Sequence, residues 1–129
     1  QVTVFFADIV GFTAISQSLT APEVMIMLND LFTRLDTATD DWCIYKVETI
    51  GDAYMCAAGL NLKGAIKKGD CDGQACPRFW AQSMLGFARE AVEMCGEVLV
   101  PRQNTPVQIR IGVHTGDVTT GVVGHKMPR

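Results

Sequence analysis

The sequence predicts an α+β fold in which an antiparallel sheet carries its helices on one face. Two observations carry this prediction. Short β-prone runs alternate with two long segments of helical periodicity, in the order β-α-β-β-α-β-β. The chain also has 129 residues, 48% of them hydrophobic, which suits a single core of ordinary size. Apart from the last strand, this order is that of the split βαβ, ferredoxin-like arrangement.

The N-terminal segment predicts a strand, a bend and a short helix. Residues 2–7 are apolar at nearly every position, which is typical of a central strand covered on both faces. Asp8 ends this run. Gly11 then permits a tight bend, and residues 12–19 form a short helical segment.

A long helix is predicted next, and it begins at a capping box. The Thr20 hydroxyl is placed to accept a hydrogen bond from the amide of Glu23, whose carboxylate reaches back. Apolar residues recur at helical spacing over 24–35, so one side of the helix should pack on the sheet. On the other side, we expect Asp36 to face solvent. The helix should run to about Asp40.

A hairpin and a long loop follow. Residues 42–47 and 53–58 are β-prone, and the short glycine-containing connection over 48–52 predicts an antiparallel pair. The composition then becomes polar over 61–77, with no hydrophobic periodicity. This segment is predicted to be a surface loop insertion, long for a compact domain.

The last third of the chain predicts a helix and a second hairpin. Helical spacing resumes over 79–99, with Gly86 as a weak point. Residues 107–113 and 118–123 are apolar runs on either side of a turn at 116–117.

Composition excludes several function classes. The net charge of −3 argues against a general nucleic-acid or anionic-membrane surface. No apolar run reaches the roughly 18 residues of a membrane span, and we expect no membrane contact. Five cysteines at irregular spacings fit reduced thiols better than a disulfide framework. Cys71 and Cys76 are open to pairing or metal binding, although incidental thiols in an exposed loop are favoured.

Two aspartates beside glycines suggest a site for divalent metal ions. Asp8 ends the first strand, and Asp52 lies near the tip of the first hairpin. If these strands are neighbours, both carboxylates reach the same ions, and magnesium is usually bound through one or two carboxylates plus substrate phosphates. Taken alone, each aspartate is more often a turn former.

The neighbouring residues favour the metal hypothesis. Residues 9–13 offer successive backbone N–H groups around a glycine before a helix, a concavity that can hold phosphate. Arg110 is a charge in an apolar strand, and is either a solvent-facing edge residue or an anion clamp. Glu48 either accepts two donors from a planar ring edge such as that of guanine, or pairs with Lys46 two residues away on the same face.

Three segments resemble, in order, signature stretches of the class III nucleotidyl cyclases. They are FFADIVGFT (residues 5–13), KVETIGDAYM (46–55) and IRIGVHTG (109–116). The resemblance covers residues 1–129 apart from the 61–77 loop. It implies a lyase that uses two Mg²⁺ or Mn²⁺ ions per site. In this family the ribose 3′-hydroxyl of a nucleoside triphosphate attacks its own α-phosphate, releasing pyrophosphate and a 3′,5′-cyclic nucleotide.

The resemblance also implies roles for individual residues. The implied metal ligands are Asp8, Asp52 and the carbonyl of Ile9. The implied triphosphate contacts are the backbone around Gly11, Phe12 and Thr13, and the side chain of Arg110. Glu48 stands where guanylate cyclases carry a glutamate and adenylate cyclases commonly a lysine, which favours GTP.

The family's active sites form between two catalytic domains, so the resemblance implies a second cyclase domain in a homo- or heterodimer. The family's second base-selecting residue and its transition-state asparagine and arginine would follow Arg129. We therefore expect a partial domain that lacks its C-terminal part and is inactive alone. Three readings remain: a guanylate cyclase, an adenylate cyclase, or a non-catalytic partner of an active domain. The expected location is cytoplasmic, whether in a free protein or in the cytoplasmic part of a membrane protein.

Overall fold

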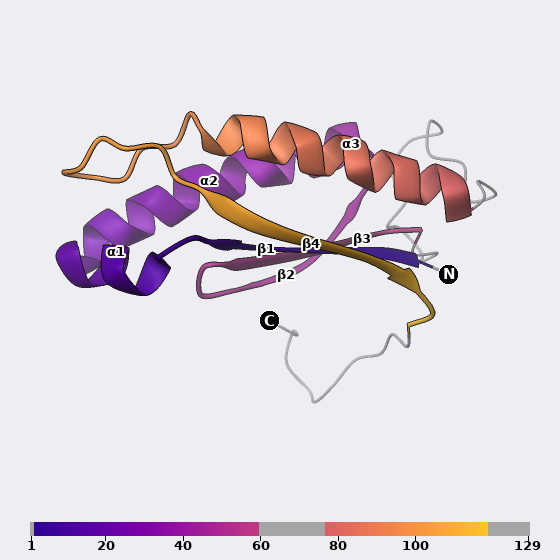
Figure 1. The fold of residues 1–129 in the computed structure, drawn as a ribbon, viewed down its shortest axis with the longest axis horizontal. Helices are drawn as coiled ribbons and strands as arrows, with labels where there is room; N and C mark the ends of the chain where they lie inside the picture. Colours follow the sequence, from indigo (N-terminus) through magenta and orange to yellow (C-terminus); the bar gives the residue numbers. More distant parts are fainter. Residues whose placement is uncertain (1, 60–76, 119–129) are drawn as a thin grey trace.

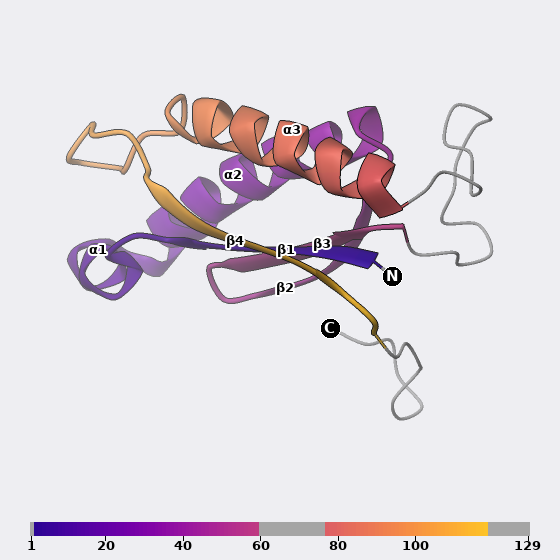
Figure 2. The same cartoon turned by 45° about the vertical axis from the view of Figure 1, so that its right-hand side comes forward.

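The computed structural model describes residues 2–59 and 77–118, which form a four-stranded antiparallel sheet with two long helices on one face (Figure 1). The elements are β1 (Val2–Ile9), α1 (Phe12–Ser18), α2 (Ala21–Asp41), β2 (Tyr45–Ile50), β3 (Ala53–Ala58), α3 (Pro77–Cys95) and β4 (Ile109–Gly116). The strand order is β2-β3-β1-β4. Figures 1 and 2 both show α2 and α3 over the same face, with α1 at the end of the sheet. The predicted α+β class and one-sided helices are confirmed.

The core lies between the sheet and the two long helices. On β1, Phe5, Ala7 and Ile9 are buried in this core, and the Phe5 ring meets Phe87 of α3 edge-on at 4.9 Å. Side chains alternate along a strand, so the residues between these three point to the opposite face. Phe6 is one of them and is 52% exposed. The prediction that this strand is covered on both faces is therefore wrong for the described residues.

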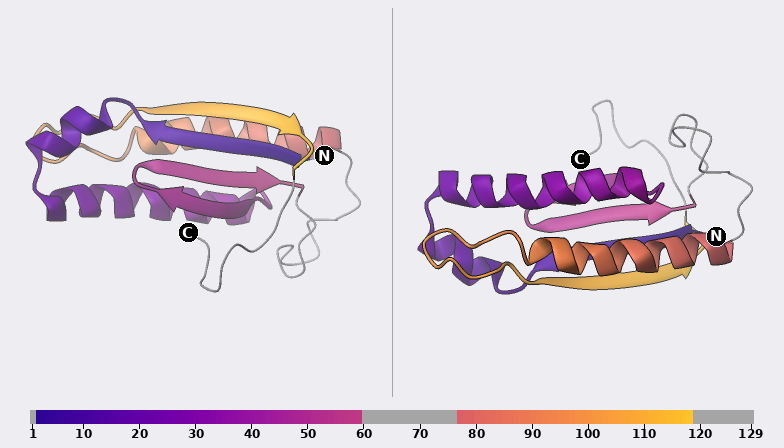
Figure 3. Two further views of the ribbon diagram at one scale, coloured as in Figure 1. Left: turned by 90° about the horizontal axis from the view of Figure 1, so that it is seen from below. Right: turned by 90° about the horizontal axis from the view of Figure 1, so that it is seen from above.

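We call the side of the sheet away from α2 and α3 the open face (Figure 3). Residues paired across an antiparallel ladder share a face. Phe6 pairs with Met55 of β3, and Met55 in turn pairs with Glu48 of β2. Asp8 pairs with Arg110 of β4. Phe6, Asp8, Glu48 and Arg110 therefore all lie on the open face.

Helix α2 begins at the predicted capping box. The Glu23 amide donates to the Thr20 hydroxyl at 3.3 Å, and the Thr20 amide donates to the Glu23 carboxylate at 2.9 Å. The helix ends at Asp41, one residue beyond the expected end. Asp36 faces solvent only in part, because its side chain is 45% exposed and its carboxylate also binds two side chains of the sheet. The residues that α2 buries are Met27, Leu31, Leu35, Ala38 and Thr39.

The first hairpin is tighter than predicted. Residues 48–50, expected in the connection, pair with β3 instead, so the turn is reduced to Gly51 and Asp52. Gly51 has a φ of +57°, a conformation that glycine adopts without strain. The ladder shifts by one residue between Lys46 and Glu48. This is a β-bulge, which the hydrophobic pattern did not indicate.

The second half of the chain supplies α3 and β4. Helix α3 ends at Cys95, four residues before the predicted end at position 99. Strand β4 continues through Gly116, where a turn was expected, because Gly116 pairs with Val2 of β1. Of the predicted loop at 61–77, residues 61–76 lie outside the described residues and Pro77 instead begins α3. The remainder of the predicted strand, at 119–123, also lies outside the described residues.

The cysteines depart from the prediction at one position. Cys56 and Cys95 are free and buried, as expected for reduced thiols, and burial raises the pKa of Cys95 to about 11. Cys43 instead is disulfide-bonded, which the spacing of the cysteines does not by itself indicate. None of the helices in the described ranges is both long and apolar enough to span a membrane.

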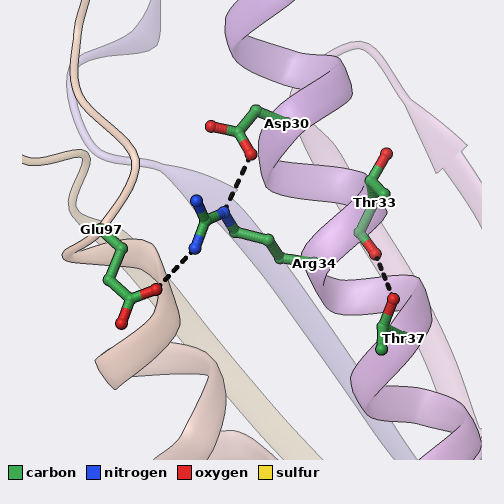
Figure 4. A network of polar contacts seen from close by, with 5 residues as sticks. All are labelled: Asp30, Thr33, Arg34, Thr37 and Glu97. Atoms are coloured by element: carbon green, nitrogen blue, oxygen red, sulfur yellow. Dashed lines mark hydrogen bonds and ion pairs between the residues drawn. The ribbon is translucent and has the colours of Figure 1, made fainter.

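Polar contacts on the surface connect the two long helices. Arg34 of α2 donates to Asp30 at 2.9 Å and to Glu97, just after α3, at 2.6 Å (Figure 4). One turn further along α2, the Thr37 hydroxyl donates to the Thr33 carbonyl at 3.1 Å. The Arg34 contacts fix the end of α3 against the middle of α2.

Candidate active site

Asp8 and Arg110 form an ion pair on the open face. They are direct cross-strand partners, and the guanidinium contacts both carboxylate oxygens, Nε to Oδ1 at 3.0 Å and Nη2 to Oδ2 at 3.2 Å. The hydrogen bond that Arg110 donates to Asp8, together with the negative charge of Asp8, raises the pKa of Arg110, and the charge of Asp52 adds to this. Arg110 thus faces solvent, as the interpretation of it as an edge residue predicted, and it also binds the carboxylate of Asp8.

Asp52 is brought to the same place by the hairpin turn. Its Oδ2 accepts a hydrogen bond from the Ile9 amide at 3.0 Å, which connects the start of β3 to the end of β1. The turn-forming and site-forming interpretations of Asp52 are therefore compatible. The structure gathers Asp8, Asp52 and Arg110 at one corner of the sheet, whereas strand adjacency predicted this only for the two aspartates.

The backbone beyond Ile9 bends at Gly11. This residue has φ +69° and ψ +25°, a left-handed conformation that favours glycine, and it immediately precedes α1. No side chain caps α1, so the amides of its first turn, including Phe12 and Thr13, donate no hydrogen bond to a capping side chain. Unsatisfied N–H groups at a helix start favour anions. This segment lies next to the corner occupied by Asp8 and Asp52.

Glu48 lies apart from this corner, on the edge strand β2. The alternative in which it pairs with Lys46 is wrong, because Lys46 binds Asp36 at 3.0 Å on the helix-covered face. Within the described ranges, Glu48 has no ion-pair or hydrogen-bond partner. Its carboxylate is therefore available to a ligand on the open face.

Comparison with known proteins establishes the family. The family model described as the adenylate and guanylate cyclase catalytic domain matches residues 1–129. The chain belongs to this family. Among curated relatives, this cyclase-family chain is 46% identical over 129 residues to human guanylate cyclase soluble subunit alpha-2, of which it covers 16%.

Solved structures of cyclase domains have the same fold. The guanylate cyclase domain of RhGC from Catenaria anguillulae, in complex with GTP, is 35% identical with a TM-score of 0.79, over 96% of this chain and 60% of that one. A guanylyl cyclase domain from Blastocladiella emersonii, described as a non-canonical dimer, is 35% identical with a TM-score of 0.76, over 95% of this chain and 61% of that one. The resemblance inferred from three short motifs thus extends over the fold.

Two features of this cyclase-family site were missed in the sequence. Phe6 and Ile50 expose 52% and 65% of their surfaces, and both lie on the face that carries Glu48. The outward position of Phe6 was missed because the continuous apolar run over residues 2–7 was interpreted as a strand covered on both faces. The second missed feature is the contact of Asp36 with the hairpin. Helical periodicity places a polar residue near the edge of the buried side, but does not show what it reaches.

Proposed function

We propose that this chain carries the metal-binding, phosphate-binding and base-selecting residues of a guanylate cyclase, which converts GTP to 3′,5′-cyclic GMP and pyrophosphate. The observation that supports this most directly is the meeting of Asp8, Asp52 and Arg110 beside the uncapped amides after Gly11. Two carboxylates, one guanidinium and free N–H groups are the chemistry that a metal–triphosphate complex needs. Guanylate cyclases among the relatives support the choice of reaction.

The donor set fits magnesium or manganese. Asp8 and Asp52 supply hard carboxylate oxygens, and the Ile9 carbonyl would be a further ligand. No group of three or more acidic, histidine or cysteine side chains occurs in the described ranges, so phosphate oxygens and water would complete the shell. Two bound ions would lower the pKa of the ribose 3′-hydroxyl and neutralise charge on the phosphates. Arg110 contacts both oxygens of Asp8 in this structure, so a metal ion would bind Asp8 only after the guanidinium turns away.

The phosphates would be held by this chain's own donors. Arg110 exposes 71% of its side chain and is free to turn from Asp8 to a phosphate, which accepts the same two-point contact. The amides of Phe12 and Thr13 are oriented by the bend at Gly11. These groups would fix the α-phosphate relative to the 3′-hydroxyl, and positioning of this kind accounts for much of the catalysis of phosphoryl transfer.

Glu48 would select the base. Guanine presents N1–H and a 2-amino group, two donors that one carboxylate accepts together, whereas the N1 of adenine is itself an acceptor. The apolar surfaces of Phe6 and Ile50 are on the same face and would pack against a purine ring. A preference of the wild-type enzyme for ATP would contradict this role and favour the adenylate cyclase reading.

The remaining partners follow from the family. We infer a second cyclase domain as partner, in a homo- or heterodimer, because the family resemblance implies one and the open face exposes apolar side chains. We also infer a cytoplasmic location, where GTP is available. The chain spans 16% of the length of the curated relative described above.

Replacing Asp52 tests the proposal. In the intact protein, Asp52→Asn should lower magnesium-dependent turnover by at least about a hundredfold, because a ligand charge is lost at the metals. Asparagine keeps an oxygen that accepts from the Ile9 amide, so the thermal midpoint should remain near that of the wild type. Asp40→Asn, an exposed position on α2, is the matched control. Wild-type turnover in Asp52→Asn would refute the metal assignment.

A further inference from the structure

Asp36 of α2 binds both strands of the hairpin that carries Glu48 and Asp52. Its Oδ1 accepts a hydrogen bond from the hydroxyl of Tyr54 on β3 at 2.7 Å. The ammonium of Lys46 on β2 lies 3.0 Å from Oδ1 and 3.1 Å from Oδ2. One carboxylate therefore connects α2 to two strands on the helix-covered face.

Tyr54 adds a buried hydrogen-bond donor to an ion pair whose own side chains are 38% (Lys46) and 45% (Asp36) exposed. Such pairs contribute little alone, since two flexible side chains must be ordered at once. Tyr54 is buried, with 1% of its surface exposed. This burial is the larger cause that raises the pKa of its hydroxyl, and the hydrogen bond to Asp36 is the second. Its hydroxyl therefore stays protonated and holds the carboxylate in place. Lys46 also lies 5.5 Å from the centre of the Tyr54 ring, within range of a cation–π contact.

The bulge in β2 separates Lys46 from Glu48. Lys46 pairs with Cys56, which is buried under the helices, and Glu48 pairs with Met55 on the open face. Val47 is the extra residue between them. In a regular strand, residues two apart point to the same side. Because of the bulge, Lys46 and Glu48 instead point to opposite sides.

We propose that Asp36 is a positioning residue for base selection, because it holds Lys46 on the helix-covered face and thereby keeps the bulge at Val47. The inference rests on the proposed role of Glu48. Two regular pairings of β2 compete with the bulge. One turns Glu48 toward the helices, and the other brings Lys46 beside Glu48 on the open face. Either pairing weakens the preference for GTP. In the first, the Glu48 carboxylate leaves the open face, and in the second, the Lys46 ammonium neutralises its charge.

The experiment compares GTP and ATP as substrates of the intact cyclase with manganese, using the ratio of their kcat/KM values. Asp36→Asn keeps the size of the side chain and an oxygen for Tyr54, but removes the charge that binds Lys46. We expect this ratio to fall by about tenfold. Asp30→Asn lies on the same helix, where Asp30 pairs with Arg34 on the surface, and should leave the ratio unchanged.

A second substitution separates positioning from general stability. Lys46→Met, added to Asp36→Asn, should return the ratio to within about threefold of wild type. Methionine packs its chain on the helix-covered face and has no charge to bring to Glu48. A stability defect at Asp36 would not be repaired by removing its partner. Amide hydrogen exchange over 45–50 should rise in Asp36→Asn and not in Asp30→Asn, independently of activity.

The outcomes distinguish this inference from the function on which it rests. If the wild type does not prefer GTP, or if Glu48→Lys leaves the ratio unchanged, the role of Glu48 fails and the inference fails with it. If Glu48→Lys lowers the ratio while Asp36→Asn changes neither the ratio nor the exchange over 45–50, only the inference is overturned.

Discussion

At the scale of single residues, the contact between Trp42 and Gly86 shows why a helix former is absent from the middle of α3. The indole N–H of Trp42 donates to Glu90, and the Ser83 hydroxyl donates to the Trp42 carbonyl at 2.9 Å. The Trp42 ring thus lies against α3 at the turn that contains Gly86. A Cβ built on Gly86 would lie 2.5 Å from this ring. The glycine therefore allows a close approach, although the sequence indicated only a weak point in the helix.

Gly86→Ala should consequently destabilise the protein. Alanine gains helix propensity, up to about 1 kcal/mol, but overpacking against a held ring costs about 1–3 kcal/mol. We expect the free energy of unfolding to fall by up to about 2 kcal/mol, measured from the urea midpoint at constant m-value. Gly96→Ala is the control, since a Cβ there meets only the Glu93 carbonyl at 3.4 Å. A Gly86→Ala protein as stable as wild type would show that Trp42 repacks freely.

Single residues also show how far sequence reasoning extends. Asp8, Asp52 and Arg110 stand out in the sequence because each is a charge at the end of, or within, a β-prone run, and neighbouring strands bring such positions together. Asp36 does not stand out in this way. Its partners, Lys46 and Tyr54, are identified only when α2 is placed on the sheet, because helical periodicity gives the buried side of a helix and not its contacts.

At the scale of elements, the strands and long helices were predictable and the details of their pairing were not. Composition and periodicity indicated β2 and β3, but the turn was expected over five residues rather than at Gly51 and Asp52. The hydrophobic pattern of the sequence also did not indicate the bulge at Val47. Its position depends on the register with β3, and register is a property of two strands together.

The start of α2 provides a prediction with a pH dependence. Hydrogen bonds from Thr20 and Arg102 lower the pKa of Glu23 from its ordinary value of 4.5. A carboxylate with a lowered folded pKa contributes stability above its unfolded pKa, and this contribution is lost as pH falls through the folded value. Glu23→Gln imitates the protonated form. It should therefore lower the thermal midpoint at pH 7 and leave it unchanged at the acid end of the range.

The measurement is the thermal midpoint of wild type and Glu23→Gln between about pH 3 and pH 7, followed by circular dichroism. Glu93→Gln serves as the control, because Glu93 is exposed and its ion pair with Arg89 is long at 4.0 Å. A difference between wild type and Glu23→Gln that is constant with pH would exclude ionisation as the cause.

At the scale of the whole molecule, the two kinds of candidate site residue lie on different strands of one open face. Asp8 and Arg110 are on β1 and β4, whereas Glu48 is on β2 at the opposite edge of the described sheet. Phe6 and Ile50 leave apolar surface exposed on the same face. Such surface is typical of an interaction site. In a dimer built as the family resemblance implies, the metal-binding residues of one chain would act on a nucleotide whose base is read by the other.

This arrangement predicts complementation between two inactive variants of the intact protein. An Asp52→Asn homodimer lacks metal binding at both sites, and a Glu48→Lys homodimer lacks guanine recognition at both. A mixed dimer contains one site in which both defects coincide and one in which neither occurs, so cyclic GMP production should recover toward half of the wild-type rate per dimer. The assay is cyclic GMP formation after co-expression of differently tagged variants and purification through both tags. Co-expressed Asp52→Asn and Asp8→Asn are the control and should remain inactive, because every site then lacks a metal carboxylate. If the mixed dimer forms but stays inactive, Glu48 and Asp52 of one chain act in the same site, and the division of the site between two chains is wrong.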